Sequence, residues 1–180
     1  MNLTIRKWLT FTICFVLLMS GSACQKKTPE TGANKEYSNA FFTCRHPKDW
    51  RISENANQLN MIGPEELGYY VNVKIDYNNN IGMNLEDFRT TVETQNNLSA
   101  LPQFKDMGQN QIKIGDQPAL QHNIITAVQA VNSPLFLYVK LIYLVKNNQL
   151  GIVITAEIPQ DSLGKYENLV NEVIQSFRFK

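Results

Sequence analysis

The stretch "LYVKLIYLVKNNQLGIVITAEIP", residues 137–159, decides the fold. Two apolar runs flank a polar "KNNQ" at 146–149, and asparagine tolerates the positive φ that tight hairpin turns require. The pattern predicts a strand over 135–146 and an antiparallel partner over 150–158. The first run is apolar on both of its sides in the middle, which is typical of a central strand covered on both faces.

Upstream, "GYYVNVKIDY" at 68–77 alternates between apolar and polar residues. Period-two alternation predicts a strand with one buried and one solvated face. The expected inward residues are Val71, Val73, Ile75 and Tyr77, and the expected outward residues are Asn72, Lys74 and Asp76. Further strands are predicted at 39–45, 50–53, 59–62, 109–114 and 119–130.

Two helices complete the pattern. Asn84 can cap a helix over 85–97, with Glu86 and Asp87 in its favourable first turn. Asp161 or Ser162 can cap a second helix near the C-terminus. The apolar stripes recur at helical spacing and consist of Leu85, Phe88 and Val92 in the first helix, and of Leu163, Tyr166, Val170, Val173, Ile174 and Phe177 in the second. The order of elements predicts an α+β domain over 39–180: an antiparallel β-sheet with helices packed on its faces.

Residues 1–23 have the layout of a secretory signal peptide. Arg6 and Lys7 form a basic start, an apolar run covers 8–19, and Gly21-Ser22-Ala23 supply small side chains before Cys24. A membrane-spanning helix needs about 20 apolar residues, so the run is too short for a permanent anchor. We therefore predict that the segment is removed on export.

Cys24 is the predicted lipidation site. The stretch resembles the bacterial lipobox, in which small residues precede a cysteine that receives acyl chains such as palmitate; the lipobox prefers Leu three places before the cysteine, where this chain has Gly21. An ordinary signal peptide cut after Ala23 is the alternative, and both readings cleave the same bond. Residues 24–38 change to Lys, Thr, Pro, Glu and Gly, and they are predicted to be a flexible tether between the bilayer and the domain.

Charge and cysteine content exclude several classes of protein. The chain has 17 basic and 16 acidic residues, and removal of Arg6 and Lys7 leaves 15 against 16. A nearly neutral chain with scattered lysines is not typical of a nucleic-acid-binding protein. Cys14 leaves with the leader and Cys24 would carry lipid, so Cys44 has no partner for an intramolecular disulfide.

The candidates for chemistry are isolated. Cys44 and His46 share one side of an extended segment but lack further ligands for a metal, so we expect a buried cysteine and a surface histidine. His122 shares a strand face with Leu120 and Ile124 and is expected to be packed and hydrogen-bonded. Asp49 is expected to serve a turn before a buried Trp50.

No residue is assigned a catalytic, metal-binding or cofactor-binding role. Glu65, Glu66 and Asp87 are expected to be solvated or helix-capping acids, and the chain contains no phosphate loop, nucleophile elbow or HExxH motif. A possible contact surface combines three tyrosines with loops rich in asparagine; polar loops without a function are the alternative. Its members are Tyr69, Tyr70, Tyr77 and residues 55–60, 78–84 and 95–97.

Five stretches in this order resemble the PsbP-type α/β/α sandwich superfamily, which includes extrinsic photosystem II subunits, a Ran-binding nuclear-transport factor and DcrB-like bacterial lipoproteins. They are "FFTCRHPKDWRI", "LEDF", "IGDQPALQHNI", the hairpin at 137–159 and "YENLVNEVIQSFRF". The resemblance implies binding and assembly rather than catalysis. We therefore expect a non-catalytic, membrane-anchored bacterial envelope lipoprotein, attached to the bilayer through acylated Cys24, that binds another envelope protein. A lipoprotein that binds a small ligand or a metal is the alternative.

Overall fold

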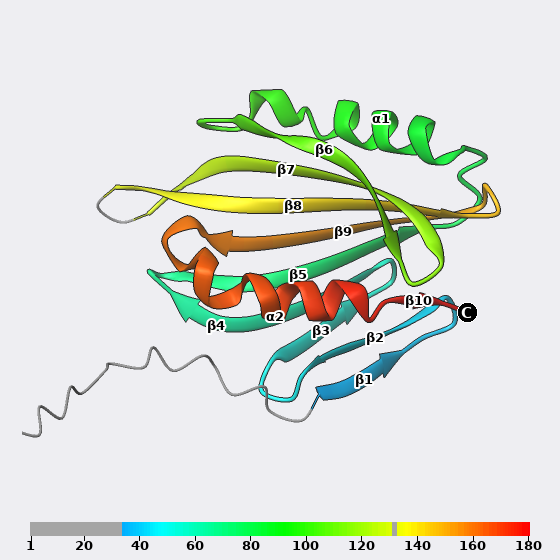
Figure 1. Ribbon diagram of the computed structural model, residues 1–180, viewed down its shortest axis with the longest axis horizontal. Coiled ribbons are helices and arrows are strands. Elements are labelled where there is room, and N and C mark those ends of the chain that lie inside the picture. Colours follow the sequence, from blue (N-terminus) through cyan, green and yellow to red (C-terminus); the bar gives the residue numbers. More distant parts are fainter. Residues whose placement is uncertain (1–33, 131–132) are drawn as a thin grey trace, which may run out of the picture.

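The structure, a computed structural model, describes residues 34–130 and 133–180 (Figure 1). Two α-helices, two short 3-10 helices and ten strands follow one another in this part of the chain. They are β1 (Asn34–Ser38), β2 (Phe42–Pro47), β3 (Arg51–Asn55), β4 (Gln58–Glu66), β5 (Tyr69–Asn78), α1 (Leu85–Gln95), η1 (Leu98–Ala100), β6 (Lys105–Ile114), β7 (Gln117–Gln129), β8 (Pro134–Lys146), β9 (Leu150–Pro159), η2 (Gln160–Ser162), α2 (Leu163–Gln175) and β10 (Arg178–Phe179).

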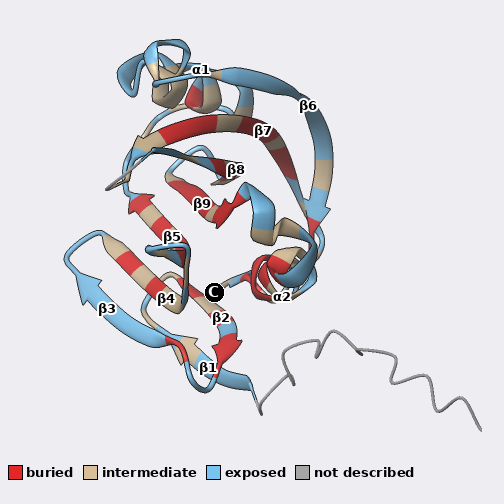
Figure 2. Cartoon of the chain, turned by 90° about the vertical axis from the view of Figure 1, so that its left-hand side faces the viewer, coloured by how far each residue is buried: buried red, intermediate tan, exposed pale blue. Residues whose placement is uncertain are grey.

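Seven strands form one antiparallel sheet in the order β3-β4-β5-β9-β8-β7-β6. The predicted hairpin is confirmed, since Lys146 pairs with Leu150 across Asn147 and Asn148, which have φ values of 54° and 55°. Strand β8 lies between β7 and β9 and is buried through its middle, as expected for a central strand. The outer strands β3 and β6 are mostly exposed, whereas the central strands are mostly buried (Figure 2).

The α2 side of this large sheet carries the larger of two apolar cores. Helix α2 contacts β2, β5 and β9. The alternation predicted for β5 is confirmed, because Val71, Val73, Ile75 and Tyr77 are all buried in this core. Gly63 in β4 allows the Trp50 indole to pack closely, since a Cβ at Gly63 would lie 2.7 Å from Trp50 Cε2.

The smaller core lies on the opposite side of the large sheet, under α1. Asn84 caps the helix as predicted, since its Oδ1 accepts a hydrogen bond of 3.0 Å from the Asp87 N–H. Phe88 is buried against β8 and β9, and Gly151 leaves the space for its ring, because a Cβ there would lie 2.6 Å from Phe88 Cζ. The helix ends at Gln95, two residues before the predicted end.

The predicted tether over 24–38 is wrong for its last five residues. Strand β1 occupies Asn34–Ser38 and pairs with β2, from Asn34 with Pro47 to Ser38 with Thr43. The domain therefore begins before residue 39, and the predicted strand at 39–45 is instead β2, at Phe42–Pro47. Strand β10 was not predicted; it pairs Phe179 with Phe42 and completes a second sheet in the order β1-β2-β10.

Candidate functional site

A groove of about 860 Å³ lies beside α1 on the face of the large sheet opposite α2. Helix α1 contacts β7 and β8, and in Figure 2 it lies far from β3 and β4. The residues that line the groove come from β3–β5, α1, η1 and β7–β9. They are Asn55, Asn57, Gln58, Tyr69, Lys74, Asp76, Asn78, Val92, Gln95, Asn96, Leu98, Leu101, Pro102, Ile124, Thr126, Ala127, Val128, Gln129, Leu137, Val139, Leu141, Tyr143, Val153, Thr155 and Glu157.

The floor of the groove and the wall beside α1 are largely apolar. Leu137, Val139 and Leu141 of β8 alternate along the strand and point to this face, beside Val153 of β9. Alternation places every second β8 side chain here, and the side chains of the other parity face α2, where Ile142 enters the core and Lys140 Nζ donates to Asn171 Oδ1 at 2.7 Å. The sheet therefore gives the groove an apolar base from strands that are buried on both faces.

The opposite wall is polar and comes mainly from the outward face of β5. Lys74 Nζ lies 3.2 Å from Asp76 Oδ2, and Gln58 Nε2 donates to Asp76 Oδ1 at 2.6 Å. Burial of Tyr69, together with the nearby Glu157 carboxylate, raises the pKa of Tyr69, so its hydroxyl stays protonated and donates to Glu157. The charged groups of this wall therefore already hold hydrogen-bonding partners.

Amide side chains stand on both rims of the groove. Asn57 and Gln58 lie on the β3–β4 side, and Gln95 and Asn96 lie at the end of α1. The Gln58 amide already donates to Asp76 and accepts from Asn55. The exposed amides of Asn57, Gln95 and Asn96 offer donors and acceptors that suit the backbone of a bound peptide or the polar groups of a small ligand. An apolar floor with a small number of polar groups beside it is typical of ligand sites in proteins.

The structure brings only part of the predicted contact surface together. Tyr69 and segments of the asparagine-rich loops line the groove, but Tyr77 points into the α2-side core and its hydroxyl donates to the Ala56 carbonyl at 3.0 Å. Tyr70 is exposed, with the Arg51 guanidinium 5.0 Å from its ring centroid. Tyr77 was predicted to lie on the buried face of its strand, and that prediction is the correct one.

His122 is packed and hydrogen-bonded, as predicted. Its side chain is buried, and its Nδ1 lies 2.9 Å from Glu93 Oε1 on α1 while its Nε2 lies 3.2 Å from Asp106 Oδ1 on β6. Arg89 Nη1 donates to the second Glu93 oxygen at 3.2 Å. The cluster joins α1 to β6 and β7 on the side of the helix away from the polar wall.

Cys44 is buried as expected, but the expected surface position of His46 is wrong. Burial raises the pKa of the Cys44 thiol to about 12, so the thiol is a poor nucleophile. His46 is also buried, and its Nδ1 lies 2.9 Å from the Pro47 carbonyl oxygen. Within residues 34–130 and 133–180 no group of three or more histidine, cysteine or acidic side chains is arranged to hold a metal ion.

Trp50, Asp87 and Glu65 lie as predicted, and Glu66 does not. Trp50 is buried, as predicted, and Asp87 hydrogen-bonds with the cap residue Asn84. Glu65 is exposed, but Glu66 is not simply solvated, because it accepts hydrogen bonds from Lys165 and from the Tyr166 hydroxyl. These two bonds attach α2 to the end of β4.

Cys24 and the predicted signal peptide at 1–23 lie outside the described residues, so lipidation stays a prediction. No helix among the described residues has the length and apolar character needed to cross a bilayer.

Three residues of these sites were not predicted from the sequence: Glu93, which contacts His122, and Thr155 and Glu157, which line the groove. The alternation of β9 places Thr155 and Glu157 on one face of the strand, but no local pattern shows that this face lines a groove.

Comparisons with known proteins bear on the fold. No protein-family model and no curated protein sequence matches the chain. The solution structure of cyanobacterial PsbP from Synechocystis sp. PCC 6803 matches with a TM-score of 0.58 and 11% identity over 83% of this chain and 94% of that one. LpqN, described as involved in cell envelope biogenesis of Mycobacterium tuberculosis, matches at 0.57 and 11% over 82% and 91%. The Saccharomyces cerevisiae Ran-binding protein Mog1p matches at 0.52 and 9% over 82% and 95%. The chain therefore has the α+β fold that PsbP, LpqN and Mog1p share.

Proposed function

We propose that the chain is a lipid-anchored, non-catalytic module of the bacterial cell envelope, and that its α1-side groove binds an extended segment of another envelope protein. The observation that carries this proposal is the groove itself. Its apolar floor can take the side chains of the segment, and its amide rims can pair with the backbone of the segment.

Export and anchoring are supported by the first 24 residues. A basic start, a short apolar run and small residues before Cys24 are the parts that export and lipid attachment require. Stable attachment needs at least two acyl chains, because a single chain binds a bilayer reversibly. Thioether-linked diacylglycerol on Cys24 would meet that requirement.

The solved structures of similar fold are compatible with a binding role. LpqN is described as an envelope protein and Mog1p as a Ran-binding protein. One fold supports many functions, so the kind of partner is inferred from the groove and from the leader rather than from these proteins.

The groove proposal is tested by site-specific photo-cross-linking in intact cells. A photoreactive amino acid at Gln95, on the groove side of α1, is expected to capture one envelope protein through a single segment. The matched control is Thr90, exposed on the same helix but outside the groove lining. Mass spectrometry of the cross-linked peptide identifies the segment, and capture of the same segment from both positions contradicts the proposal.

A synthetic copy of that segment then tests binding directly. Thr155→Trp fills the groove floor and is expected to weaken binding by at least about tenfold, while Thr90→Trp leaves binding unchanged. Far-ultraviolet circular dichroism shows whether each variant remains folded. Equal affinity in folded Thr155→Trp and wild-type protein overturns the groove assignment.

The anchor is tested separately by the intact mass of the purified protein. Wild-type protein is expected to begin at Cys24 and to carry the mass of its acyl chains, and Cys24→Ala is expected to lack them. If wild type and variant differ only by the side-chain substitution, the lipoprotein proposal fails and the groove proposal does not.

A small-ligand function is the second candidate, and the groove volume favours it. A volume of about 860 Å³ falls within the usual range of small-molecule sites, about 300–1,000 Å³. Native mass spectrometry of protein purified from membranes distinguishes the two functions: a retained small-molecule adduct, lost in Thr155→Trp, supports the ligand and contradicts the peptide.

A further inference from the structure

The lining of the groove has one negative charge in excess. Its charged residues are Lys74, Asp76 and Glu157. Lys74 and Asp76 neutralise each other, since Lys74 Nζ lies 3.2 Å from Asp76 Oδ2. Within residues 34–130 and 133–180, no lysine, arginine or histidine forms an ion pair with the Glu157 carboxylate. Glu157 is therefore an acid of the groove without a counter-ion in this part of the chain.

The sheet register places Glu157 between the polar wall and the apolar floor. On one side Glu157 of β9 pairs with Asn72 of β5, and on the other side it pairs with Val139 of β8. Directly paired residues of an antiparallel sheet project their side chains to the same face. The glutamate is partly buried there. Partial removal from water makes a carboxylate costly unless a cation or hydrogen-bond donors compensate it.

The compensation inside the domain is neutral and uses one oxygen. Glu157 Oε2 accepts hydrogen bonds from the Tyr69 hydroxyl and from Asn72 Nδ2, the latter at 2.9 Å. These two donors fix the orientation of the carboxylate. Oε1 accepts no hydrogen bond from a described residue, and it is not among the enclosed polar atoms that lack a partner. Oε1 is therefore accessible to a bound molecule.

A small pocket of about 340 Å³ adjoins the groove at this carboxylate, and we call it the side pocket. Tyr69, Lys74 and Glu157 line both the groove and the side pocket. Aromatic rings and an isoleucine can pack against methylene groups, and the carboxylate can pair with a cation beyond them. The side pocket thus has the chemistry that suits a long basic side chain. Its other lining residues are Asn60, Ile62, Gly68, Tyr70 and Asn72.

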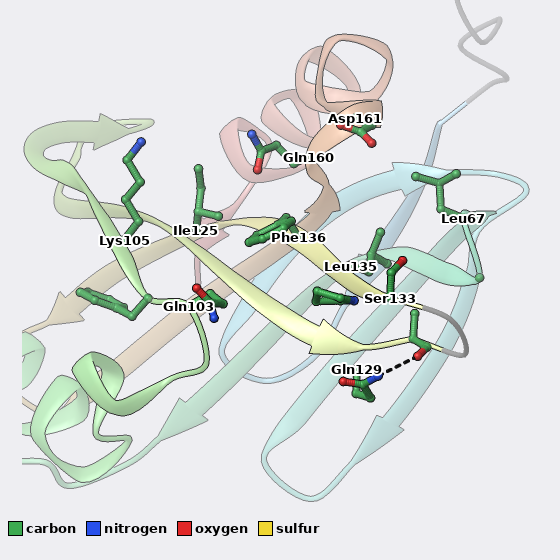
Figure 3. A pocket seen from close by; sticks show the side chains of 14 residues that line it. Leu67, Gln103, Lys105, Ile125, Gln129, Ser133, Leu135, Phe136, Gln160 and Asp161 are labelled. Carbon is green, nitrogen blue, oxygen red and sulfur yellow. Dashed lines mark hydrogen bonds between the residues drawn. The ribbon is translucent and has the colours of Figure 1, made fainter.

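A larger hollow of about 1200 Å³ lacks this excess of charge. It lies between the β4–β5 turn, the end of β7, the start of β8 and η2 (Figure 3). Its charged lining residues are Lys105 and Asp161, which stand on separate sides of the hollow in Figure 3. One charge of each sign gives the hollow no preference for a cation, so it serves as a comparison for the groove.

We propose that the segment bound in the groove carries a lysine or arginine whose side chain enters the side pocket and pairs with Glu157 Oε1. This inference rests on the proposed function, because it names the chemistry of the segment that the groove binds. The methylene groups of the basic residue lie along Ile62 and Tyr69. Every second residue of an extended segment faces the same way, so apolar residues for the groove floor stand two positions from the basic one.

The test selects binders from a phage-displayed library of random ten-residue peptides. The target is the full, processed protein reconstituted in phosphatidylcholine nanodiscs, and empty nanodiscs remove peptides that bind lipid. Sequencing is expected to show lysine or arginine at one position at least about tenfold above its frequency in the unselected library, because charge-assisted hydrogen bonds are strong. Apolar residues are expected two positions away.

Three variants locate the preference. Glu157→Gln removes the charge but keeps an oxygen for Tyr69 and Asn72, and it is expected to lose the preference for a basic residue while it keeps the preference for apolar ones. Glu172→Gln, at an exposed position of α2 outside the groove lining, is expected to keep both. Asp161→Asn, which removes the acid of the larger hollow, is also expected to keep both.

A synthetic copy of the most enriched peptide measures the pair directly. Replacing its basic residue with norleucine is expected to raise the Kd at least about tenfold for wild-type protein and less than about twofold for Glu157→Gln. Circular dichroism shows whether the variant remains folded. A diazirine-bearing lysine analogue at the basic position needs no variant, and it is expected to cross-link wild-type protein within residues 69–74 or 155–159.

The outcomes separate this inference from the proposed function. A basic preference that persists in folded Glu157→Gln, or apolar preference without a basic one in wild-type protein, overturns the pairing with Glu157 and leaves the groove proposal in place. Loss of the basic preference in Asp161→Asn, or cross-links only outside the two expected segments, also overturns the pairing. If wild-type protein enriches no peptide, the peptide-binding proposal fails and this inference fails with it.

Discussion

The two faces of the large sheet are built from the same strands but are covered to different extents. On the α2 side, the helix and strand β2 close over a continuous apolar core that includes Phe42 and Phe177, whose ring centroids are 5.1 Å apart. On the α1 side, the helix covers β7 and β8 and leaves a groove toward β5. Apolar strands therefore do not decide whether a face becomes a closed core or a groove; the position of the covering helix does.

The attachment of each helix explains this difference. Helix α2 is tied to β4 through Glu66 and Tyr166 and packs across β5 and β9, so it lies over the middle of the sheet. Helix α1 is tied through Glu93 to His122 on β7, which is next to the edge strand β6. A helix held near one edge leaves the other part of its face open.

The largest expected effects compare Leu141 and Ile142, neighbours on β8 that face opposite sides. Ile142 is 1% exposed in the closed core, and Leu141 is 7% exposed in the groove floor. Ile142→Ala is expected to lower the free energy of unfolding by about 4 kcal/mol because it leaves a closed cavity, and Leu141→Ala by about 2 kcal/mol because its space joins the groove. Urea unfolding measures both free energies, and equal losses would show that the groove floor is packed as tightly as the closed core.

Glycine substitutions test how tightly the open face is packed beneath α1. Gly151→Ala forces its new methyl group against Phe88 and is expected to destabilise the protein by about 1–3 kcal/mol. Gly164→Ala is the control on α2, where a Cβ meets no heavy atom within 4 Å, and it is expected to stabilise the helix by up to about 1 kcal/mol. Thermal unfolding measures whether each substitution raises or lowers the melting temperature. An unchanged melting temperature in Gly151→Ala would show that Phe88 repacks freely.

The cap of α1 is expected to have an intermediate effect. Asn84→Ala removes the hydrogen bond to the Asp87 N–H and should cost about 1 kcal/mol, with faster amide exchange confined to the first turn of α1. Asn84→Asp keeps the acceptor and is expected to restore most of the loss. If amide exchange in α2 rises as much as amide exchange in α1, the two helices do not open independently of each other.

The smallest effect concerns pH and the attachment of α2. Hydrogen bonds from Lys165 and Tyr166 lower the pKa of the Glu66 carboxyl group below its usual range. Because the folded pKa is below the unfolded pKa, the stabilisation is present above the unfolded value of about 4.3 and is lost as the pH falls through the folded value. Glu66→Gln is expected to flatten the loss of stability between about pH 5 and pH 3 by less than about 1 kcal/mol, because solvent screens the pair. Glu65→Gln, at the exposed neighbour, should leave the slope unchanged.

Much of the fold could be predicted because local patterns agreed with the tertiary structure. The β5 alternation, the hairpin at Asn147 and the cap at Asn84 each depend on a few adjacent residues, and the structure confirms all three. Strand β1 was missed because "NKEYS" is polar and mostly exposed, so its strand state comes from pairing with β2. Strand β10 has two residues, too few for a periodic signal.

The two candidate residues placed wrongly, His46 and Glu66, differ in the cause of the error. His46 shares the strand face of Phe42 and Cys44, so the local alternation of β2 accounts for its burial. Glu66 was interpreted as solvated because Tyr166, its partner, lies 100 residues further along the chain. A distant partner leaves no local pattern.

The sequence alone predicts both α-helices and every strand except β1 and β10, the apolar faces of most of these elements, and the export and lipidation signal in the first 24 residues. Periodicity, capping and turn preference are short-range properties, and a chain carries them in its local order. The pairing of β5 with β9, which are separated in the chain by α1, β6, β7 and β8, is visible only in the folded structure. That long-range pairing places the polar face of β5 opposite α1, and the groove exists because of it.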